Sequence, residues 1–260
     1  MKTLIICTTA FLASLSSLFS GFGLGTVLMP VFALFFPLPL AIGATAVIHL
    51  LSNYFKLFLV GKWANKTVIL QFGIPAALAS ALGAYLLSLF SRTTPLFTYE
   101  LFNHSFHITL LGIIVGPIVI LSSLGEFFPF KFSFSSGFMP LGGFLSGFFG
   151  GLSGNQGAFR SAFLIHAGLT KEQFIGTTVI VSILVDLTRL IVYGWAIYWQ
   201  QLSTVLSKEL QGILLAASLA AFAGAYLGAK WLPALTFKRL KILVAVMLLL
   251  LGSAITMGIA

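Results

Sequence analysis

The chain has 260 residues, of which 59% are apolar and only 7% are charged, and its formal net charge is +9. A soluble domain has roughly a quarter of its residues charged, so this composition excludes a soluble protein and indicates an integral membrane protein. The basic excess does not indicate nucleic-acid binding, because the 14 lysines and arginines are spread between apolar runs. The single cysteine, Cys7, excludes an intrachain disulfide.

Apolar runs follow one another along the chain and predict an all-α membrane protein. They cover residues 4–20, 26–36, 40–60, 67–89, 106–124, 136–150, 156–168, 173–198, 210–231 and 239–258. A helix needs about 20 apolar residues to cross a bilayer, so the second and seventh runs are too short to cross alone. The first run follows Lys2 and also has the layout of a signal peptide. Its place in an internal repeat favours a structural helix.

The two halves of the chain resemble each other. Similar residues recur in the same order: Gly43 and Gly176, Thr45 and Thr178, Asn53 and Asp186, Lys56 and Arg189, and later Gly83-Ala84-Tyr85-Leu86 and Gly224-Ala225-Tyr226-Leu227. The first four pairs share a spacing of 133 residues. The sequence therefore predicts two homologous transmembrane repeats, 1–125 and 135–260, joined by a loop at 126–134.

Each repeat is expected to contain a glycine-broken helical hairpin followed by three transmembrane helices. If each broken segment turns back within the membrane, the repeats are inverted, and eight loop cations lie on one side of the membrane and three on the other. If each broken segment crosses once, the repeats are parallel and the two sides carry five and six. The positive-inside rule favours the first arrangement. We therefore expect inverted repeats in the cell membrane, with both termini outside the cytoplasm.

Both short runs follow a glycine-rich break, at 21–25 and 150–157. Backbone groups freed by a break within a bilayer must be satisfied by protein, water or ligand, and matched breaks in two repeats point to a transport site. Helices opening near Thr26 and Ala158 would present free N–H groups and a positive dipole end to an anion. The alternative is that the glycines only allow close helix packing. The two breaks are expected to meet near the bilayer midplane.

Arg160 lies three residues beyond Gly157 in an apolar segment, where a guanidinium facing lipid would cost about 2.5 to 3.5 kcal/mol. It is expected to face a cavity or a partner, and its fork of donors suits a sulfonate, sulfite or carboxylate. Snorkelling or a structural ion pair is the alternative. The predicted substrate-binding residues are Gly23, Gly25, Thr26, Thr45, Ser153, Gly154, Asn155, Gln156, Gly157, Arg160 and Thr178.

A second polar group lies within the long runs and consists of His49, Asn53, Lys56, Asp186 and Arg189. Asp186 and Arg189 are three residues apart on one helix and are expected to pair. His49 is either a proton carrier or a satisfied core residue. Lys56 either attracts the anion or extends toward a loop. This group therefore either couples transport to an ion or forms a structural polar pair. His104 and His107 have no well-placed further ligand, and no metal site is predicted.

Residues Gly21-Phe22-Gly23-Leu24-Gly25-Thr26-Val27-Leu28-Met29-Pro30 resemble the glycine-rich signature of the TauE/SafE sulfite exporter family, also called the four-toluene sulfonate uptake permeases. In that family a G-x-G-G-G-x-L-x-x-P run precedes an A-x-G-T segment, here Ala41-Ile42-Gly43-Ala44-Thr45, and residues 151–163 look like a variant signature. The resemblance implies a secondary transporter of sulfur-containing anions. Leu24 replaces a family glycine, and the second signature carries Asn155, Gln156 and Arg160 instead of the triple glycine and proline.

The sequence thus predicts a permease that moves a small anion, such as sulfite or an organosulfonate, by alternating access and without a cofactor. Its other partners are membrane lipid and, as an open alternative, H⁺ or Na⁺ as coupling ion. A channel-like anion pathway or a permease for a carboxylate are the competing functions. No enzyme is expected: Gly151-Leu152-Ser153-Gly154 matches the string of rhomboid proteases, but only His166 follows it as a base.

Overall fold

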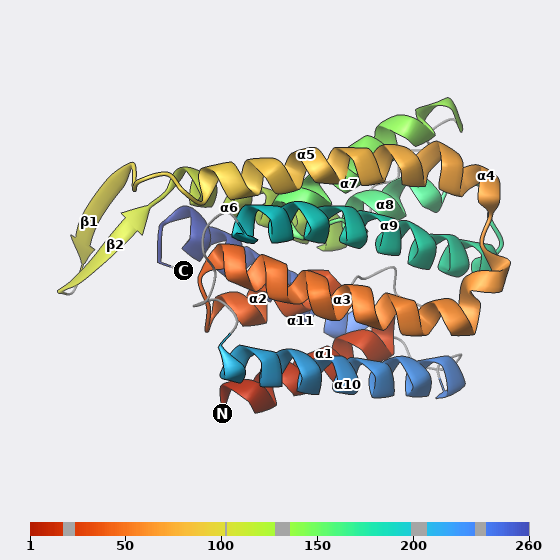
Figure 1. Ribbon diagram of the computed structural model, residues 1–260, viewed down its shortest axis with the longest axis horizontal. Helices are drawn as coiled ribbons and strands as arrows, with labels where there is room; N and C mark the ends of the chain where they lie inside the picture. The colour runs from red at the N-terminus through yellow and green to blue at the C-terminus, as the bar shows by residue number, and fades with distance from the viewer. Residues whose placement is uncertain (18–23, 102, 128–135, 199–206, 232–237, 260) are drawn as a thin grey trace.

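The computed structural model describes residues 1–17, 24–101, 103–127, 136–198, 207–231 and 238–259. It is built mainly of helices (Figure 1): α1 (Lys2–Ser17), α2 (Leu24–Ala33), α3 (Leu38–Val60), α4 (Lys66–Val68), α5 (Ile74–Phe90), α6 (Leu110–Phe127), α7 (Met139–Ser153), α8 (Gly157–Leu164), α9 (Lys171–Tyr198), α10 (Lys208–Trp231) and α11 (Lys238–Thr256). Single turns of other helix types lie at η1 (Gly61–Trp63), η2 (Ile69–Gly73) and η3 (Ser136–Phe138).

Several helices are long and apolar enough to cross a membrane. By length and composition these are Leu38–Trp63, Lys66–Phe90, Lys171–Trp195 and Lys208–Lys230. Helices suit this environment because they satisfy their own backbone N–H and C=O groups. Two helices carry a proline in their first turn, where no intrahelical hydrogen bond is lost: Pro39 and Pro140. Pro75 instead follows the π-helical turn η2 within the continuous span Lys66–Phe90.

The structure is consistent with the predicted all-α membrane protein, but residues 97–108 add a β-hairpin that the sequence pattern did not predict. Strand β1 (Phe97–Leu101) pairs antiparallel with β2 (His104–Ile108), and the rings of Tyr99 and Phe106 lie opposite each other, 5.4 Å apart. The strands are short and mostly exposed, and β2 takes up the start of the apolar run predicted at 106–124. His104 and His107 therefore lie in strand β2.

Helices of the first half pack along helices of the second half. At the top of Figure 1, α5 lies beside α7, and at the bottom α1 lies beside α10. Both approaches depend on glycine: a Cβ on Gly83 of α5 would overlap the carbonyl oxygen of Phe148, and a Cβ on Gly224 of α10 would overlap that of Phe11. Small residues thus bring these backbones into direct contact. α3 also packs on α9, and α6 on α11.

The second glycine break is a tight turn between two antiparallel helices. Gly154 ends α7 at φ +80°, a left-handed conformation that glycine adopts without strain. α8 then runs back along α7, since the ring of Phe159 stacks on that of Phe149 at 4.6 Å and Gly142 lies against the ring of Phe163. α8 begins at Gly157, one residue before the expected position.

The first break falls mainly on residues outside the described ranges. Gly21 and Gly23 lie there, between the end of α1 at Ser17 and the start of α2 at Leu24. Gly25 and Thr26 belong to the first turn of α2 and are buried. Of the predicted connecting loop at 126–134, residues 126 and 127 belong to α6 and the others also lie outside the described ranges.

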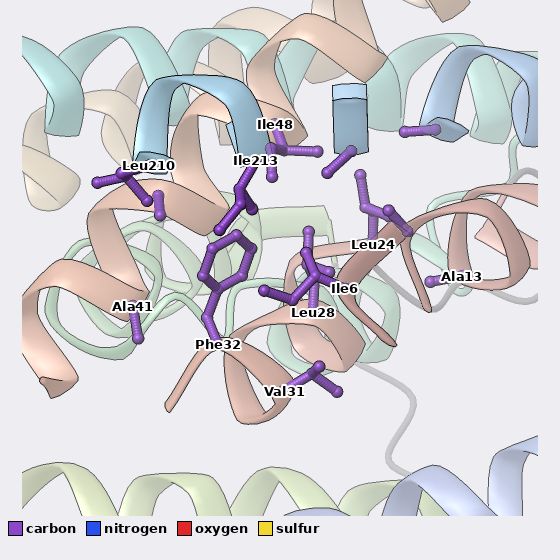
Figure 2. Close-up of a cluster of buried hydrophobic side chains, with 14 residues drawn as sticks. Ile6, Ala13, Leu24, Leu28, Val31, Phe32, Ala41, Ile48, Leu210 and Ile213 are labelled. Atoms are coloured by element: carbon purple, nitrogen blue, oxygen red, sulfur yellow. The ribbon is translucent and has the colours of Figure 1, made fainter. Parts of the chain in front are cut away.

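The short helix α2 is enclosed by protein and does not need to cross the membrane. Figure 2 shows its apolar side chains meeting those of α1, α3 and α10. The fully buried members of this cluster include Ile6, Leu24, Leu28, Phe32 and Ile48. This core fixes the start of α2, and therefore Gly25, against α3.

Both termini lie at one end of the bundle, together with the hairpin (Figure 1). There Lys2 pairs with Glu209 at 2.6 Å, and the hydroxyl of Tyr99 donates to the carbonyl of Met257 at 2.8 Å. The opposite end carries η1, α4 and the start of α9, where the Asn65 N–H donates to Thr177 Oγ1 at 2.9 Å. The elements at that end carry several cations: Lys62 in η1, Lys66 in α4 and Lys171 at the start of α9. α10 also ends there (Figure 1) and carries Lys230 in its last turn.

Candidate functional site

The polar residues of the two long central helices meet inside the bundle. Their spacing of three or four residues places them on one face of each helix, and α3 packs on α9 along these faces. His49 Nδ1 lies 2.5 Å from Asp186 Oδ2 and joins the two helices directly. The buried residues of these faces are Thr45, His49, Asn53 and Lys56 on α3 and Ser182, Asp186 and Arg189 on α9.

Asp186 is the acceptor at the centre of this group. Its Oδ1 atom accepts from Arg189 Nη2 at 2.7 Å and from Gln156 Nε2 at 3.2 Å. Asp186 and Arg189 are thus paired, as their spacing on the helix predicts. Arg189 Nη1 also donates to the carbonyl of Gly150 in α7 at 2.9 Å. Through these bonds α9 holds both the last turns of α7 and the residue that precedes α8.

The start of α2 lies against the turn between α7 and α8. A Cβ on Gly25 would lie 3.5 Å from the carbonyl oxygen of Gly154, 3.7 Å from His49 Cδ2 and 3.8 Å from Thr45 Cγ2. A Cβ on Gly154 would in turn lie 3.6 Å from Arg189 Nη1. The two regions that carry the glycine breaks therefore meet, and they do so beside the polar faces of α3 and α9.

Arg160 on α8 is buried in the same region, with 2% of its surface exposed. Its Nη1 donates to Ser182 Oγ at 2.5 Å, and Ser182 donates to the carbonyl of Thr178 at 2.9 Å. Within the described ranges no carboxylate pairs with Arg160 or Lys56. Arg160 therefore neither snorkels to the surface nor forms a structural ion pair there.

Lys56 is also buried and donates to Ser17 Oγ at 2.6 Å. Its charge and that of Arg160 repel each other across the cluster. Among the described buried residues, three cations, Lys56, Arg160 and Arg189, face the single carboxylate of Asp186. Such a positive excess is unfavourable in a low-dielectric interior and attracts negative charge.

A scan against protein-family models matches residues 6–255 to the sulfite exporter TauE/SafE family. The chain belongs to this family. Family membership, together with the apolar helices, makes it a multi-pass membrane transporter from a group that carries sulfite and related sulfur anions. The comparisons with curated proteins and with solved structures gave no match.

Among the described residues of this TauE/SafE protein, several buried side-chain nitrogen and oxygen atoms have no hydrogen-bond partner. Such atoms are normally paired, because leaving one unpaired costs about 1 to 3 kcal/mol. Every one of them belongs to the cluster around the two glycine breaks: Thr45 Oγ1, Asn155 Nδ2 and Oδ1, Gln156 Oε1, Arg160 Nε, Thr178 Oγ1 and Arg189 Nε. These atoms therefore lie together, beside the buried side chains of Lys56, Arg160 and Arg189.

Ser153, Gly157 and Thr26 were also predicted for the site, and none of them has an unpartnered side-chain atom among the described residues of this TauE/SafE protein. Ser153 Oγ donates to the carbonyl of Phe149 at 2.9 Å and lies 3.4 Å from the Asn155 N–H, so its hydroxyl is already occupied. Gly157 and Thr26 begin α8 and α2 and are buried. In a helix the N–H groups of the first turn lack an intrahelical acceptor, so the start of α8 retains free donors for a ligand or water.

Two buried polar residues of the cluster were not predicted from the sequence of this family member. Ser182 Oγ accepts a hydrogen bond from the Arg160 guanidinium, and the hydroxyl of Tyr193 donates to the carbonyl of Gly151. A signal for Ser182 was available, because it lies one helical turn from Thr178 and from Asp186 and 133 residues after His49. Tyr193 gave no such signal, since tyrosine is common near membrane interfaces.

Proposed function

We propose that this TauE/SafE protein is a secondary permease that binds a small sulfur-containing oxyanion or organosulfonate, such as sulfite, where α2, α3, α8 and α9 meet. The observation that carries the proposal is the set of unpartnered polar atoms beside an excess of buried positive charge. A ligand with negative oxygens supplies acceptors for the donors of this set.

The proposed binding site uses both side chains and backbone. Arg160 Nε and Asn155 Nδ2 are free donors, and the unpartnered hydroxyls of Thr45 and Thr178 approach from α3 and α9. The first turn of α8 adds N–H groups and a positive dipole end. The two free acceptors, Asn155 Oδ1 and Gln156 Oε1, suit a water molecule or the O–H group of a protonated oxyanion.

The proposal includes two inverted repeats, 1–125 and 135–260, that move against each other. The packing of α1 on α10 and of α5 on α7 supports it. In each pair a helix of one half packs on a helix of the other half, and the matched glycines Gly83 and Gly224 each lie against a backbone carbonyl of the partner helix. Rocking about the α3–α9 contact would expose the site to each side in turn. The grouping of lysines at the end opposite the termini supports termini outside the cytoplasm.

A thermal-shift series on the purified protein tests the binding site. Sulfite, sulfate, methanesulfonate, acetate and phosphate are added in turn, and a ligand at 100 times its Kd stabilises the folded state by about 2.7 kcal/mol. We expect the sulfur anions to stabilise the wild type and Lys208→Ala, whose exposed cation lies outside the cluster, but not Arg160→Ala. Equal stabilisation of Arg160→Ala would remove Arg160 from the site, and a response to acetate alone would favour a carboxylate permease.

Counterflow in proteoliposomes tests alternating access. Unlabelled anion inside the vesicles should accelerate uptake of the labelled anion, since a carrier returns faster when loaded. A channel-like pathway would show no such acceleration and no saturation.

A further inference from the structure

We infer that His49 and Asp186 form a proton-binding site that loads together with the anion, so that the permease moves a proton with its substrate. The inference rests on the proposed function, because it needs an anion bound in the neighbouring cluster. It assigns the coupling ion and the residue that carries it.

The geometry identifies the atom that takes up the proton. His49 Nδ1 faces Asp186 Oδ2 at 2.5 Å, so in a neutral ring Nδ1 carries the hydrogen and Nε2 is the base, which accepts from Asn53 Nδ2 at 3.3 Å. Asp186 is an unsuitable carrier, because its other oxygen is held by Arg189 and Gln156. His49 is 3% exposed, and the Cδ2 atom next to Nε2 lies 3.7 Å from the position of a Cβ on Gly25. The proton therefore binds at Nε2, next to Asn53 and the start of α2, and the Asn53 amide turns its oxygen toward the ring to accept it.

The charges around His49 make its protonation depend on the anion. From α9, Asp186 attracts and Arg189 repels a proton on the ring; from its own helix, Lys56 repels it, and Arg160 on α8 adds to the positive charge of the cluster. α2 contains no charged residue, and the charged residues of α10 lie exposed at its ends: Lys208, Glu209 and Lys230.

The three buried cations outnumber the carboxylate by two, and a protonated His49 would add a further positive charge to this buried cluster. Such an accumulation is unfavourable at low dielectric. A bound anion removes part of this excess and favours the protonated ring. By linkage the proton then favours the anion to the same extent, so the two ligands load and leave together.

The pair also lies where the proposed repeats meet. His49 belongs to the first half and Asp186 to the second, and the residues at their matching positions are Ser182 and Asn53, which do not titrate. One proton site is therefore shared between the halves. Movement of α3 against α9 changes the surroundings of this site directly.

The first test measures proton uptake by the purified protein in weakly buffered solution on addition of sulfate or methanesulfonate. Both probes remain fully ionised at neutral pH, so any uptake belongs to the protein. We expect uptake of at most a single proton per chain by the wild type and by His166→Gln, whose histidine is exposed, and loss of this uptake in His49→Gln. Anion binding to the wild type without proton uptake would overturn the inference.

The second test uses proteoliposomes and separates this inference from the proposed function. An inward proton gradient should drive accumulation of labelled sulfate or methanesulfonate by the wild type. His49→Gln should lose this accumulation, whereas its counterflow exchange should persist with a lower affinity for the anion. Full proton-driven accumulation by His49→Gln would overturn the inference and leave the anion site standing. Absence of both binding and exchange in the wild type would instead contradict the proposed function for these probes, and with it the inference.

Discussion

Lys56 and Arg189 lie at matching positions, and each binds the end of the helix that precedes the glycine break in its own half. Lys56 Nζ donates to Ser17 Oγ at the last residue of α1, and Arg189 Nη1 donates to the carbonyl of Gly150 near the end of α7. A cation is favourable at a helix C-terminus, where carbonyl groups lack partners. The difference between the halves is the acid: Asp186 lies beside Arg189, whereas Asn53 lies beside Lys56.

Asp186→Asn should therefore lower the stability of the protein. The change removes the carboxylate that Arg189 and His49 share, and loss of one partner from a buried pair costs about 3 to 5 kcal/mol. Thermal unfolding of the purified variant measures the effect. The double variant Asp186→Asn, Arg189→Met should recover part of the loss, because it leaves no unpaired guanidinium. An unchanged melting temperature in the single variant would contradict this account.

Gly25→Ala should weaken anion binding while leaving the fold intact. The added methyl group meets only ordinary contacts, the nearest being the Gly154 carbonyl at 3.5 Å, but it occupies space between the two breaks. We expect about a tenfold loss of affinity, equivalent to about 1.4 kcal/mol, in the thermal-shift titration. Gly43→Ala is the matched control, because a Cβ there has no neighbour within 4 Å among the described atoms. Equal affinities for the two variants would place the anion elsewhere.

Gly83→Ala and Gly224→Ala should destabilise the protein to a similar degree. In each variant the new methyl group would overlap a backbone carbonyl of the partner helix and force the helices apart. Overpacking of this kind costs about 1 to 3 kcal/mol. Thermal unfolding compares both with Gly194→Ala, where a Cβ has no described neighbour within 4 Å. A loss confined to one of the two glycines would argue against equivalent repeats.

The orientation in the membrane can be tested with single cysteines. In a Cys7→Ser background, Lys208→Cys lies at the end that carries the termini, because its neighbour Glu209 pairs with Lys2. Lys62→Cys lies in η1, next to α4 at the opposite end. A membrane-impermeant maleimide added to intact cells should label Lys208→Cys, and Lys62→Cys only after permeabilisation. The reverse pattern would place both termini in the cytoplasm.

Local features of the candidate site could be predicted from the sequence, whereas the packing between distant helices could not. The turn at Gly154 and the pairing of Asp186 with Arg189 follow from local spacing, because glycine breaks a helix and residues three apart share a face. The packing of α1 on α10 could not be predicted, since Gly224 indicates a close approach without identifying the approaching helix. The β-hairpin was missed because its five-residue strands were read together with the apolar run of α6.

The pairing of α1 with α10 sets an order for biosynthesis. At about 5 to 20 residues per second, the 191 positions that separate Ser17 from Lys208 delay the arrival of α10 by roughly 10 to 40 seconds. During this interval the faces of α1 that later contact Gly224 and Gly228 have no permanent neighbour. The nascent chain must therefore remain in the membrane as a loosely assembled intermediate until its penultimate helix is synthesised, and a ribosome that stalls before Lys208 leaves a product that cannot close.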